Sequence, residues 1–376
     1  MIWTVVIILS AVSLLAVYSS TGSLAYRFHG GSTTYFLIKQ LIFLGLGLSI
    51  VFITHLISYK VYYPLSTILL GISVPLLLIT LVFGATLNQA SRWLEVPGLG
   101  ITFQTSDVAK LALIMYISKI LSQKQKDIKD LRQGFVPLVV PVGLICMLIL
   151  PANFSTAALL GLACWIMMFV GRVNLKYLLG FTGLGIILLG AFIVIALQFK
   201  NVGRVHTWIN RIENFASGDN GDGNYQVEQS KIAIATGGII GKGPGRSTQR
   251  NFLPHPYSDF IFAIIVEEYG LLGGTIILAL YLILLFRSAL IVKNAKRTFP
   301  AFLAFGLALL MALQALVNMM VAVNLIPVTG QPLPLVSMGG TSLFFSSAAF
   351  GIILSISRSQ SKTELFDGEE PVEDNN

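Results

Sequence analysis

Residues 251–270 read NFLPHPYSDFIFAIIVEEYG, and this stretch sets an acid, Asp259, at the start of a long apolar run with Glu267 and Glu268 inside it. The run continues to residue 286, which is longer than the about 20 residues that a membrane-spanning helix needs. Ionisable residues inside spanning helices are rare, and they mark paired or functional positions. The stretch therefore predicts a membrane fold and raises the question of what three acids do there.

The rest of the chain has the composition of a membrane protein. Of its 376 residues, 55% are hydrophobic and 11% are charged, against about 25% charged in soluble domains. We predict an all-α polytopic protein with one transmembrane domain over residues 1–358, a long loop at 200–258 and a disordered acidic tail at 359–376. The apolar segments predict ten spans, at residues 2–20, 35–57, 62–84, 104–121, 135–151, 154–170, 177–199, 259–286, 300–325 and 339–357.

The distribution of Lys and Arg predicts how the chain crosses the membrane. If the N-terminus lies inside the cell, more than half of the 25 Lys and Arg residues fall in inner loops and the tail. Both termini are therefore expected in the cytoplasm, and the loop 200–258 outside it. The net charge of +8 reflects this topology and not nucleic-acid binding, since no basic groove interleaved with aromatic residues is visible.

A second polar stretch surrounds the fourth predicted span. Arg92 precedes the span, and Asp107 and Lys110 lie three residues apart inside it, a spacing that permits a local ion pair. The alternative is that Lys110 faces an anionic group. Counting about 1.5 Å per residue along continuous helices places Lys110 in the outer half of the bilayer and Asp259 at the outer head groups.

Simpler structural explanations for the acids remain open. Ser258 and Asp259 are favourable residues for a helix N-cap, and spacing alone favours that role for Asp259. Glu267 and Glu268 are consecutive in the sequence, so on a helical wheel their side chains point about 100° apart and are not expected to face one partner. The stretch GGIIGKGPGRS at 237–247 resembles a phosphate loop but lacks the Ser or Thr that must follow its Lys, so we expect no phosphate loop there.

The sequence names no metal site. The four histidines are scattered and the two cysteines lie in apolar spans without zinc-ligand spacing. No cofactor is therefore predicted, and a requirement for a divalent cation stays open.

Three ordered blocks resemble the SEDS family of bacterial shape, elongation, division and sporulation proteins, whose members are RodA, FtsW and SpoVE. The blocks are RWLEVPGLGITFQTSDVAKL (92–111), YQVEQSKIAIATGGIIGKGPGRSTQRNFLPHPYSDFIFAIIVEEYG (225–270) and LIPVTGQPLPLVSMGGTSL (325–343). Together with the predicted spans they cover nearly the whole chain. The motif VSMGGTS and the acidic tail favour the FtsW-like branch over the RodA-like branch.

The resemblance implies a multi-pass enzyme of the bacterial cytoplasmic (inner) membrane, a peptidoglycan glycosyltransferase that polymerises lipid II, the undecaprenyl-diphosphate-linked disaccharide peptide, at the outer face. It implies a class B penicillin-binding protein and other divisome or elongasome membrane proteins as partners. Asp259 matches the essential Asp of the family motif Thr-Asp-Phe-Ile-Phe, here Ser-Asp-Phe-Ile-Phe, and is expected to be the general base. The other matching positions are expected to bind substrate (Arg92, Lys110, Gln226, Gln229, Ser230, Ser337, Gly339 and Gly340) or to support the site (Glu267 and Glu268).

The chain departs from the family pattern at several positions, none of which touches Asp259. Thr105 and Asp107 replace the usual Pro and Glu, and Asn153 stands where an acid is common. Met338 and Thr341 replace Tyr and Ser. A role for an acid at position 153 is therefore not expected here.

Two functions of other classes remain open. A flippase for the same lipid would also use a groove with Lys and acids, although it should need charges at both membrane depths. A scaffold that recruits a partner enzyme would use Asp259 only as a cap, so that Asn could replace it. Small residues in AFLAFGLALLMA (301–312) make that stretch a candidate docking face for a partner span.

Overall fold

The computed structural model describes residues 1–22, 33–87, 90–96, 101–198, 205–217, 222–254, 256–295 and 297–367. Each of the ten predicted spans corresponds to a helix in this part of the chain. The helices are α1 (Ile2–Ser20), α3 (Thr33–Leu56), α4 (Tyr59–Phe83), α5 (Thr105–Gln123), α6 (Val136–Ile149), α7 (Phe154–Val170), α8 (Leu175–Gln198), α11 (Ile261–Asn294), α12 (Thr298–Ala322) and α13 (Thr341–Asp367).

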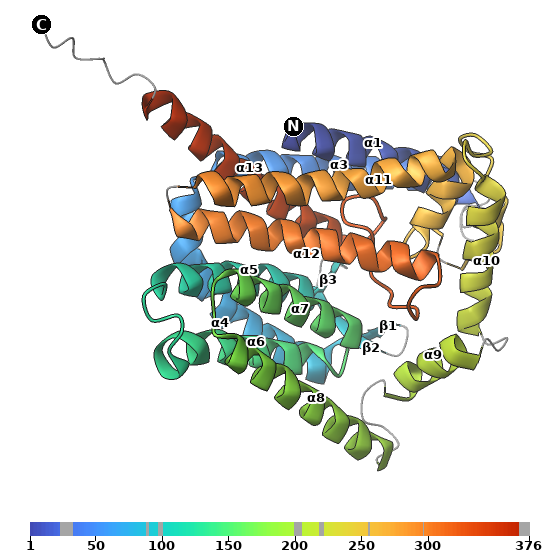
Figure 1. Cartoon of the computed structure of the whole chain (residues 1–376). Helices are drawn as coiled ribbons and strands as arrows, with labels where there is room; N and C mark the ends of the chain where they lie inside the picture. Colours follow the sequence, from blue (N-terminus) through green and yellow to red (C-terminus); the bar gives the residue numbers. More distant parts are fainter. Residues whose placement is uncertain are drawn as a thin grey trace, which may run out of the picture.

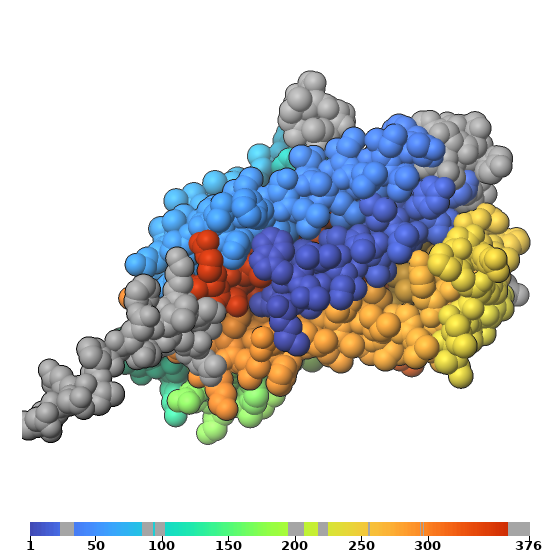
Figure 2. All heavy atoms as spheres, turned by 90° about the horizontal axis from the view of Figure 1, so that it is seen from above, coloured from blue at the N-terminus to red at the C-terminus, as the bar shows by residue number. Residues whose placement is uncertain are grey.

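Eight of the helical segments in the described part are long and apolar enough to cross a membrane. The other two predicted spans correspond to α7, which is a shorter apolar helix, and α5, which carries Asp107, Lys110 and Lys119. Figures 1 and 2 show α1 running toward α10 (Asp222–Gly237) and α13 running away from it. Both chain termini therefore point away from α10, as the predicted topology requires. Which end of the helix bundle faces the cytoplasm stays a prediction.

The connections between the spans contain more secondary structure than the sequence suggested. Between α4 and α5 the chain forms a small antiparallel sheet, ordered β1 (Ala85–Leu87), β2 (Ala90–Val96) and β3 (Ile101–Gln104). The all-α prediction missed this sheet because its strands are short and lack a clear period. The long loop holds α9 (Val205–Ser217), α10 and a short 3₁₀ turn, η2 (Gln249–Asn251), while a π-helical turn, η1 (Leu131–Phe135), precedes α6.

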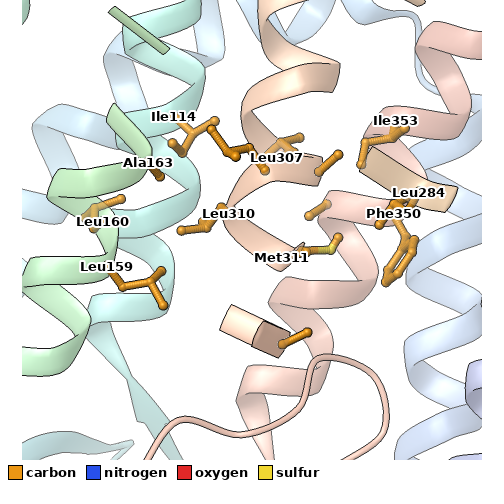
Figure 3. Packing of buried hydrophobic residues seen from close by; sticks show 14 of the residues in the cluster. Ile114, Leu159, Leu160, Ala163, Leu284, Leu307, Leu310, Met311, Phe350 and Ile353 are labelled. Atoms are coloured by element: carbon orange, nitrogen blue, oxygen red, sulfur yellow. The ribbon is translucent and has the colours of Figure 1, made fainter. Parts of the chain in front are cut away.

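The core of the bundle is built around α12. Its face packs against α5, α7, α11 and α13, and Gly306 lies so close to α7 that an added Cβ would sit 2.5 Å from Met167 Cε. The expectation that 301–312 is a docking face is therefore wrong, since its small residues are buried inside this chain. Figure 3 shows the packing through Ile114, Leu159, Leu160, Ala163, Leu284, Leu307, Leu310, Met311, Phe350 and Ile353.

The predicted eighth span is not one continuous helix. Gly270 has φ 70° and ψ −173°, and it breaks α11 near its N-terminal end. The backbone of residues 237–243 fills the break: Lys242 N and Gly243 N donate to the carbonyls of Glu267 and Glu268, and Leu271 N donates to Gly238 O. A residue count along α11 is therefore no measure of the depth of Asp259, and the stretch that resembles a phosphate loop is a structural insert.

The last helix extends past the predicted end of the domain. The transmembrane domain was expected to end at residue 358, yet α13 continues to Asp367. The disorder predicted for the tail stays a prediction for residues 368–376, which lie outside the described part.

Candidate active site

Asp259 lies in a turn that leads into α11. The helix begins at Ile261 after Phe260, and in the described part of the chain no side chain caps it, so the predicted helix cap is wrong. Ser258 Oγ donates to Asp259 Oδ1 at 2.9 Å. A Cβ added at Gly330 would lie 3.5 Å from Oδ2, so the carboxylate faces the backbone at Gly330, where φ is 68°. Asp259 is half-buried.

Residues 325–340 wrap the Asp259 turn through backbone contacts. Met338 N donates to Tyr257 O at 2.9 Å, and Ser337 Oγ donates to Ser258 O at 2.7 Å while accepting from Leu333 N at 2.8 Å. Ser337 is buried, and its hydroxyl hydrogen is used in the hydrogen bond to Ser258 O. The structure thus brings two sequence blocks, 225–270 and 325–343, into one site, and Ser337 connects them by a hydrogen bond.

Two glycines end the wrapping segment where α13 starts. Gly340 has φ 56°, a left-handed conformation that favours Gly. A Cβ at Gly339 would lie too close to Ser342 Oγ. Both positions are therefore explained by backbone geometry, and the substrate contacts expected for them stay a prediction.

Lys110 forms the local ion pair that its spacing predicted. Its Nζ lies 2.7 Å from Asp107 Oδ1, and both side chains line a small cavity of about 40 Å³ between α5, α12 and α13. Gln314 of α12 also lines this cavity and donates to Pro332 O at 2.9 Å. Asn318 lies one helical turn further along α12 and contacts the Asp259 turn, so Lys110 and Asp259 flank the same helix face.

Arg92 lies in β2, and its side chain is outside the described part of the chain. The sheet pairs Trp93 with Gln104, the last residue before α5. Gln104 N donates to Thr341 Oγ1 at 3.4 Å. The strand that carries Arg92 is therefore tied to the starts of α5 and α13, beside the segment that wraps Asp259. Whether Arg92 binds substrate stays a prediction.

The three predicted residues of α10 are not placed alike. Ser230 is buried and donates to Ala322 O at 2.7 Å, which ties α10 to the end of α12. Gln226 and Gln229 are half-buried on the same helix. Around them α10 packs on the start of α11 through Val227, Leu253, Phe260, Ile264 and Val321. Ser230 thus holds the scaffold together, and its predicted substrate contact is untested.

Glu267 and Glu268 both bind the chain around residues 242–249, which continues from the segment that fills the break in α11. Glu267 lies 2.6 Å from Lys242 Nζ and accepts from Thr248 N at 3.1 Å and Thr248 Oγ1 at 2.9 Å. Ser247 donates its hydroxyl to Glu267 and its N–H, at 3.2 Å, to Glu268. The expectation that the two acids cannot share a partner is wrong, because Ser247 offers a side-chain and a backbone donor at once.

An apolar cavity of about 470 Å³ opens between α7, α8, α9 and α12. Its lining includes Val328 and Thr329, which directly precede Gly330, the residue beside Asp259. Trp208 of α9 contacts Phe154 of α7 with ring centroids 5.1 Å apart. The other lining residues are mainly aliphatic (Ala158, Leu159, Leu162, Leu189, Ile193, Ile209, Ile212, Leu313, Val317 and Ile326), with Arg211 and Asn153 among the polar ones.

Tyr257 is the titratable neighbour of Asp259. Burial, and next the negative charge of Asp259, raise the pKa of the Tyr257 phenol, so it stays protonated at neutral pH. Groups of three or more His, Cys, Asp or Glu residues that could hold a metal ion are not found in the described ranges. The requirement for a divalent cation therefore stays open.

Several residues of the site were missed from the sequence. Asn318, Gln331 and Tyr257 contact or adjoin Asp259, yet none was predicted. The signal for one of them was present, because Gln314 and Asn318 stand four residues apart inside an apolar span and so share one helix face.

Comparisons with known proteins agree with the three blocks. The profile of the FtsW, RodA and SpoVE family, described as cell cycle protein, matches residues 1–362. A Geobacter sulfurreducens protein named probable peptidoglycan glycosyltransferase FtsW is 35% identical over 368 residues, covering 94% of this chain and 95% of the relative. The stage V sporulation protein E of Bacillus subtilis is 34% identical over 361 residues, with 94% and 95% covered.

Solved structures share the fold over nearly the whole chain. A chain of a peptidoglycan synthase complex, studied for its coordination of polymerization and crosslinking, matches with a TM-score of 0.72 and 26% identity, covering 95% of this chain and 98% of that chain. The rod shape determining protein RodA of Thermus thermophilus matches with a TM-score of 0.67 and 25% identity, covering 95% and 97%. The chain is a multi-pass protein of the bacterial cytoplasmic membrane, and it belongs to the FtsW, RodA and SpoVE family.

Proposed function

We propose that this chain is a peptidoglycan glycosyltransferase that polymerises lipid II at the outer face of the cytoplasmic membrane, with Asp259 as general base. The observation that carries the proposal is the position of Asp259, a half-buried acid beside Gly330, which directly follows two residues that line a large apolar cavity. The name of the Geobacter relative supports the activity. The sequence motifs support the FtsW-like branch.

The apolar cavity suits the lipid part of such a substrate. Its volume of about 470 Å³ and its aliphatic lining accept part of a polyprenyl chain, while the rest stays in the bilayer. A head group toward Asp259 is consistent with the lining, which includes Thr329, the residue before Gly330. Arg211 lines the same cavity, where it donates to Val328 O at 2.9 Å.

The reaction transfers a sugar from a lipid diphosphate to a sugar hydroxyl. The hydroxyl oxygen attacks the anomeric carbon, its proton passes to Asp259, and the bond from that carbon to the diphosphate oxygen breaks. Direct attack inverts the configuration and needs no covalent intermediate. A placed general base contributes about 10²–10⁴-fold to the rate.

The leaving diphosphate needs positive charge. Lys110 and Arg92 supply it in this proposal, with Arg suited to bidentate contacts to phosphate oxygens. Lys110 is paired with Asp107 in this structure, and both side chains line the small cavity, so a bound diphosphate must compete with Asp107 for the ammonium group. Gln226, Gln229, Gly339 and Gly340 remain proposed contacts of the head group.

A class B penicillin-binding protein that crosslinks the glycan is the proposed partner, together with other divisome or elongasome membrane proteins. The matching chain of a peptidoglycan synthase complex supports such an assembly.

Glycan polymerisation by the purified chain tests the proposal. The chain is combined with a matched class B penicillin-binding protein whose transpeptidase is blocked, lipid II is added, and the products are separated on a gel. Asp259→Asn is compared with the wild type and with Asp130→Asn, a matched acid-to-amide change at a turn where Asn also caps. We expect polymer from the wild type and the Asp130 variant and none from folded Asp259→Asn.

Other outcomes separate the alternatives. Equal amounts of polymer from the wild type and Asp259→Asn would overturn the role of Asp259 as general base, while the proposed glycosyltransferase activity would still hold. No polymer from either, together with movement of lipid II across liposome membranes, would replace the enzyme with a flippase.

A further inference from the structure

A single buried amide joins the two segments that build the site. Asn318 of α12 is 1% exposed, and its Nδ2 donates to the backbone carbonyls of Asp259 and Gln331, each at 2.8 Å. Both amide hydrogens are thereby used. The two acceptors belong to segments 72 positions apart, and Ser337 and Met338 add the further hydrogen bonds between these segments described above.

The rest of the Asn318 amide has no comparable role. In the described part of the chain no group donates to its Oδ1, although the atom is buried. An unsatisfied acceptor in an apolar helix opposes folding. The residue therefore contributes its two donors at an energetic disadvantage that an apolar side chain of similar size would avoid, which argues for a geometric role.

A second buried contact braces the Gln331 side of this joint. Gln331 is 4% exposed, and its Nε2 donates to Thr156 Oγ1 at 2.8 Å. Thr156 lies in the first turn of α7, where its N–H donates to Asn153 Oδ1 at 3.3 Å. Asn153 also lines the apolar cavity. The start of α7 is thus connected to Asp259 by a chain of side chains, Thr156, Gln331 and Asn318, each of them buried.

We propose that Asn318 is a positioning residue for Asp259, and that Gln331 and Thr156 hold it in register; this inference rests on the proposed function. By fixing the Asp259 carbonyl, Asn318 fixes the direction in which the carboxylate leaves the turn, toward Gly330. A misplacement of a reacting group by about 1 Å can lower a rate about 10²-fold. Loss of the two donors should therefore slow the chemical step and leave substrate binding intact.

Replacement of Asn318 by Leu tests the proposal, because Leu has a similar size and suits an apolar helix. The control is Tyr281→Phe, which removes one buried hydrogen bond, from Tyr281 Oη to Pro334 O at 2.5 Å, to the same wrapping segment without touching Asp259. Both variants are assayed for kcat and KM with lipid II, per folded molecule, and for Tm. We expect Asn318→Leu to lower kcat about 10–100-fold with KM within about threefold, and Tyr281→Phe to keep kcat near the wild type.

A milder variant covers the case in which Asn318→Leu does not fold. Thr156→Val keeps the shape of the side chain and removes the acceptor for Gln331. We expect a loss of kcat of about two- to fivefold, again with KM unchanged, because the brace is one contact removed from Asn318.

The outcomes are distinguishable from failure of the proposed function. If Asp259→Asn is inactive while Asn318→Leu has wild-type kcat, or loses activity only in proportion to its folded fraction, the positioning role is wrong and the proposed function stands. If Asp259→Asn retains full activity, the general base is wrong and the inference falls with it.

Discussion

Asp259 and Glu267 lie eight residues apart in the chain, and the structure treats the two acids in opposite ways. Glu267 is 0% exposed and accepts from Lys242, Ser247, Thr248 and the N–H of Gln249. Asp259 is half-buried, and within the described ranges its carboxylate accepts from the neighbouring Ser258. The backbone around Asp259 is fastened tightly while its carboxylate is left accessible.

The difference separates an acid that holds structure from an acid that is free to react. A carboxylate with every lone pair occupied is stabilised in its charged form and has little capacity left for a substrate. A carboxylate fixed through its backbone keeps both direction and capacity, which suits a general base. Exposure and hydrogen-bond saturation therefore distinguish the two acids better than their depth in the membrane does.

The strongest test of this difference is Asp259→Asn. We expect its polymerisation rate to fall about 10²–10⁴-fold, because the amide cannot take the proton. Its Tm in detergent should stay close to that of the wild type, since the structural contacts of the turn use the backbone. A large fall in Tm would place Asp259 beside Glu267 as a structural acid.

Glu267→Gln should show the reverse pattern. We expect the free energy of unfolding to fall by about 2–3 kcal/mol, because Lys242 loses its counter-charge and four further donors lose a charged acceptor. The value is below the about 3–5 kcal/mol of a fully buried pair since Lys242 keeps 28% of its side chain exposed. Denaturant unfolding gives the loss, and kcat per folded molecule should change less than about threefold.

The double variant Lys242→Met/Glu267→Gln is the control for charge. Removing both partners should recover part of the lost stability, because no uncompensated charge stays buried. A double variant that is less stable than Glu267→Gln would show that the hydrogen bond from Lys242 Nζ to Thr248 Oγ1, at 3.1 Å, outweighs the relief of the uncompensated charge.

The segment that holds Glu267 offers a smaller effect. Gly245 has φ 74° with open space where a Cβ would stand, so Gly245→Ala isolates the backbone penalty, about 1–2 kcal/mol. The matched control is Gly185→Ala in α8, also with open space but helical, which should raise stability by about 0.5–1 kcal/mol. Thermal unfolding of both variants checks the pair, and equal shifts would contradict it.

Much of the fold was predictable because its signal is local. Apolar length alone located the ten helices at the predicted spans, and the ion pair of Asp107 and Lys110 followed from their spacing. The break in α11 was not predictable, because a segment some thirty positions earlier, 237–243, creates it. For the same reason Lys242 was set aside with the apparent phosphate loop, although it is the ion-pair partner of Glu267.

The candidate site was predictable only in part. Asp259 stood out as an acid at the start of an apolar run, its expected role and the two blocks came from the resemblance, and the structure shows that the blocks meet. Asn318 and Gln331 were missed because the contacts between them and Asp259 use backbone carbonyls as acceptors, which leave no residue pattern in a sequence. Ser230 and Ser337 were expected to bind substrate, and in this structure their buried hydroxyls donate to carbonyls of this chain, so their substrate contacts stay predictions. A polar residue at a family position does not reveal whether it faces substrate or backbone.

Asp130 provides the smallest effect and a third kind of acid, fully exposed at the opposite end of the protein. The N–H groups of Gln133 and Arg132 hold the pKa of the Asp130 carboxyl below its usual range. A lowered folded-state pKa contributes stability above the unfolded pKa of about 3.9, and this contribution is lost as the pH falls through the folded value. Asp130→Ala should therefore lower Tm slightly at pH 7, by an amount that stays constant down to about pH 5 and vanishes in acid. A difference that instead changed between pH 6 and 8 would require another titrating group at that turn, and it would remove Asp130 as the neutral reference for Asp259.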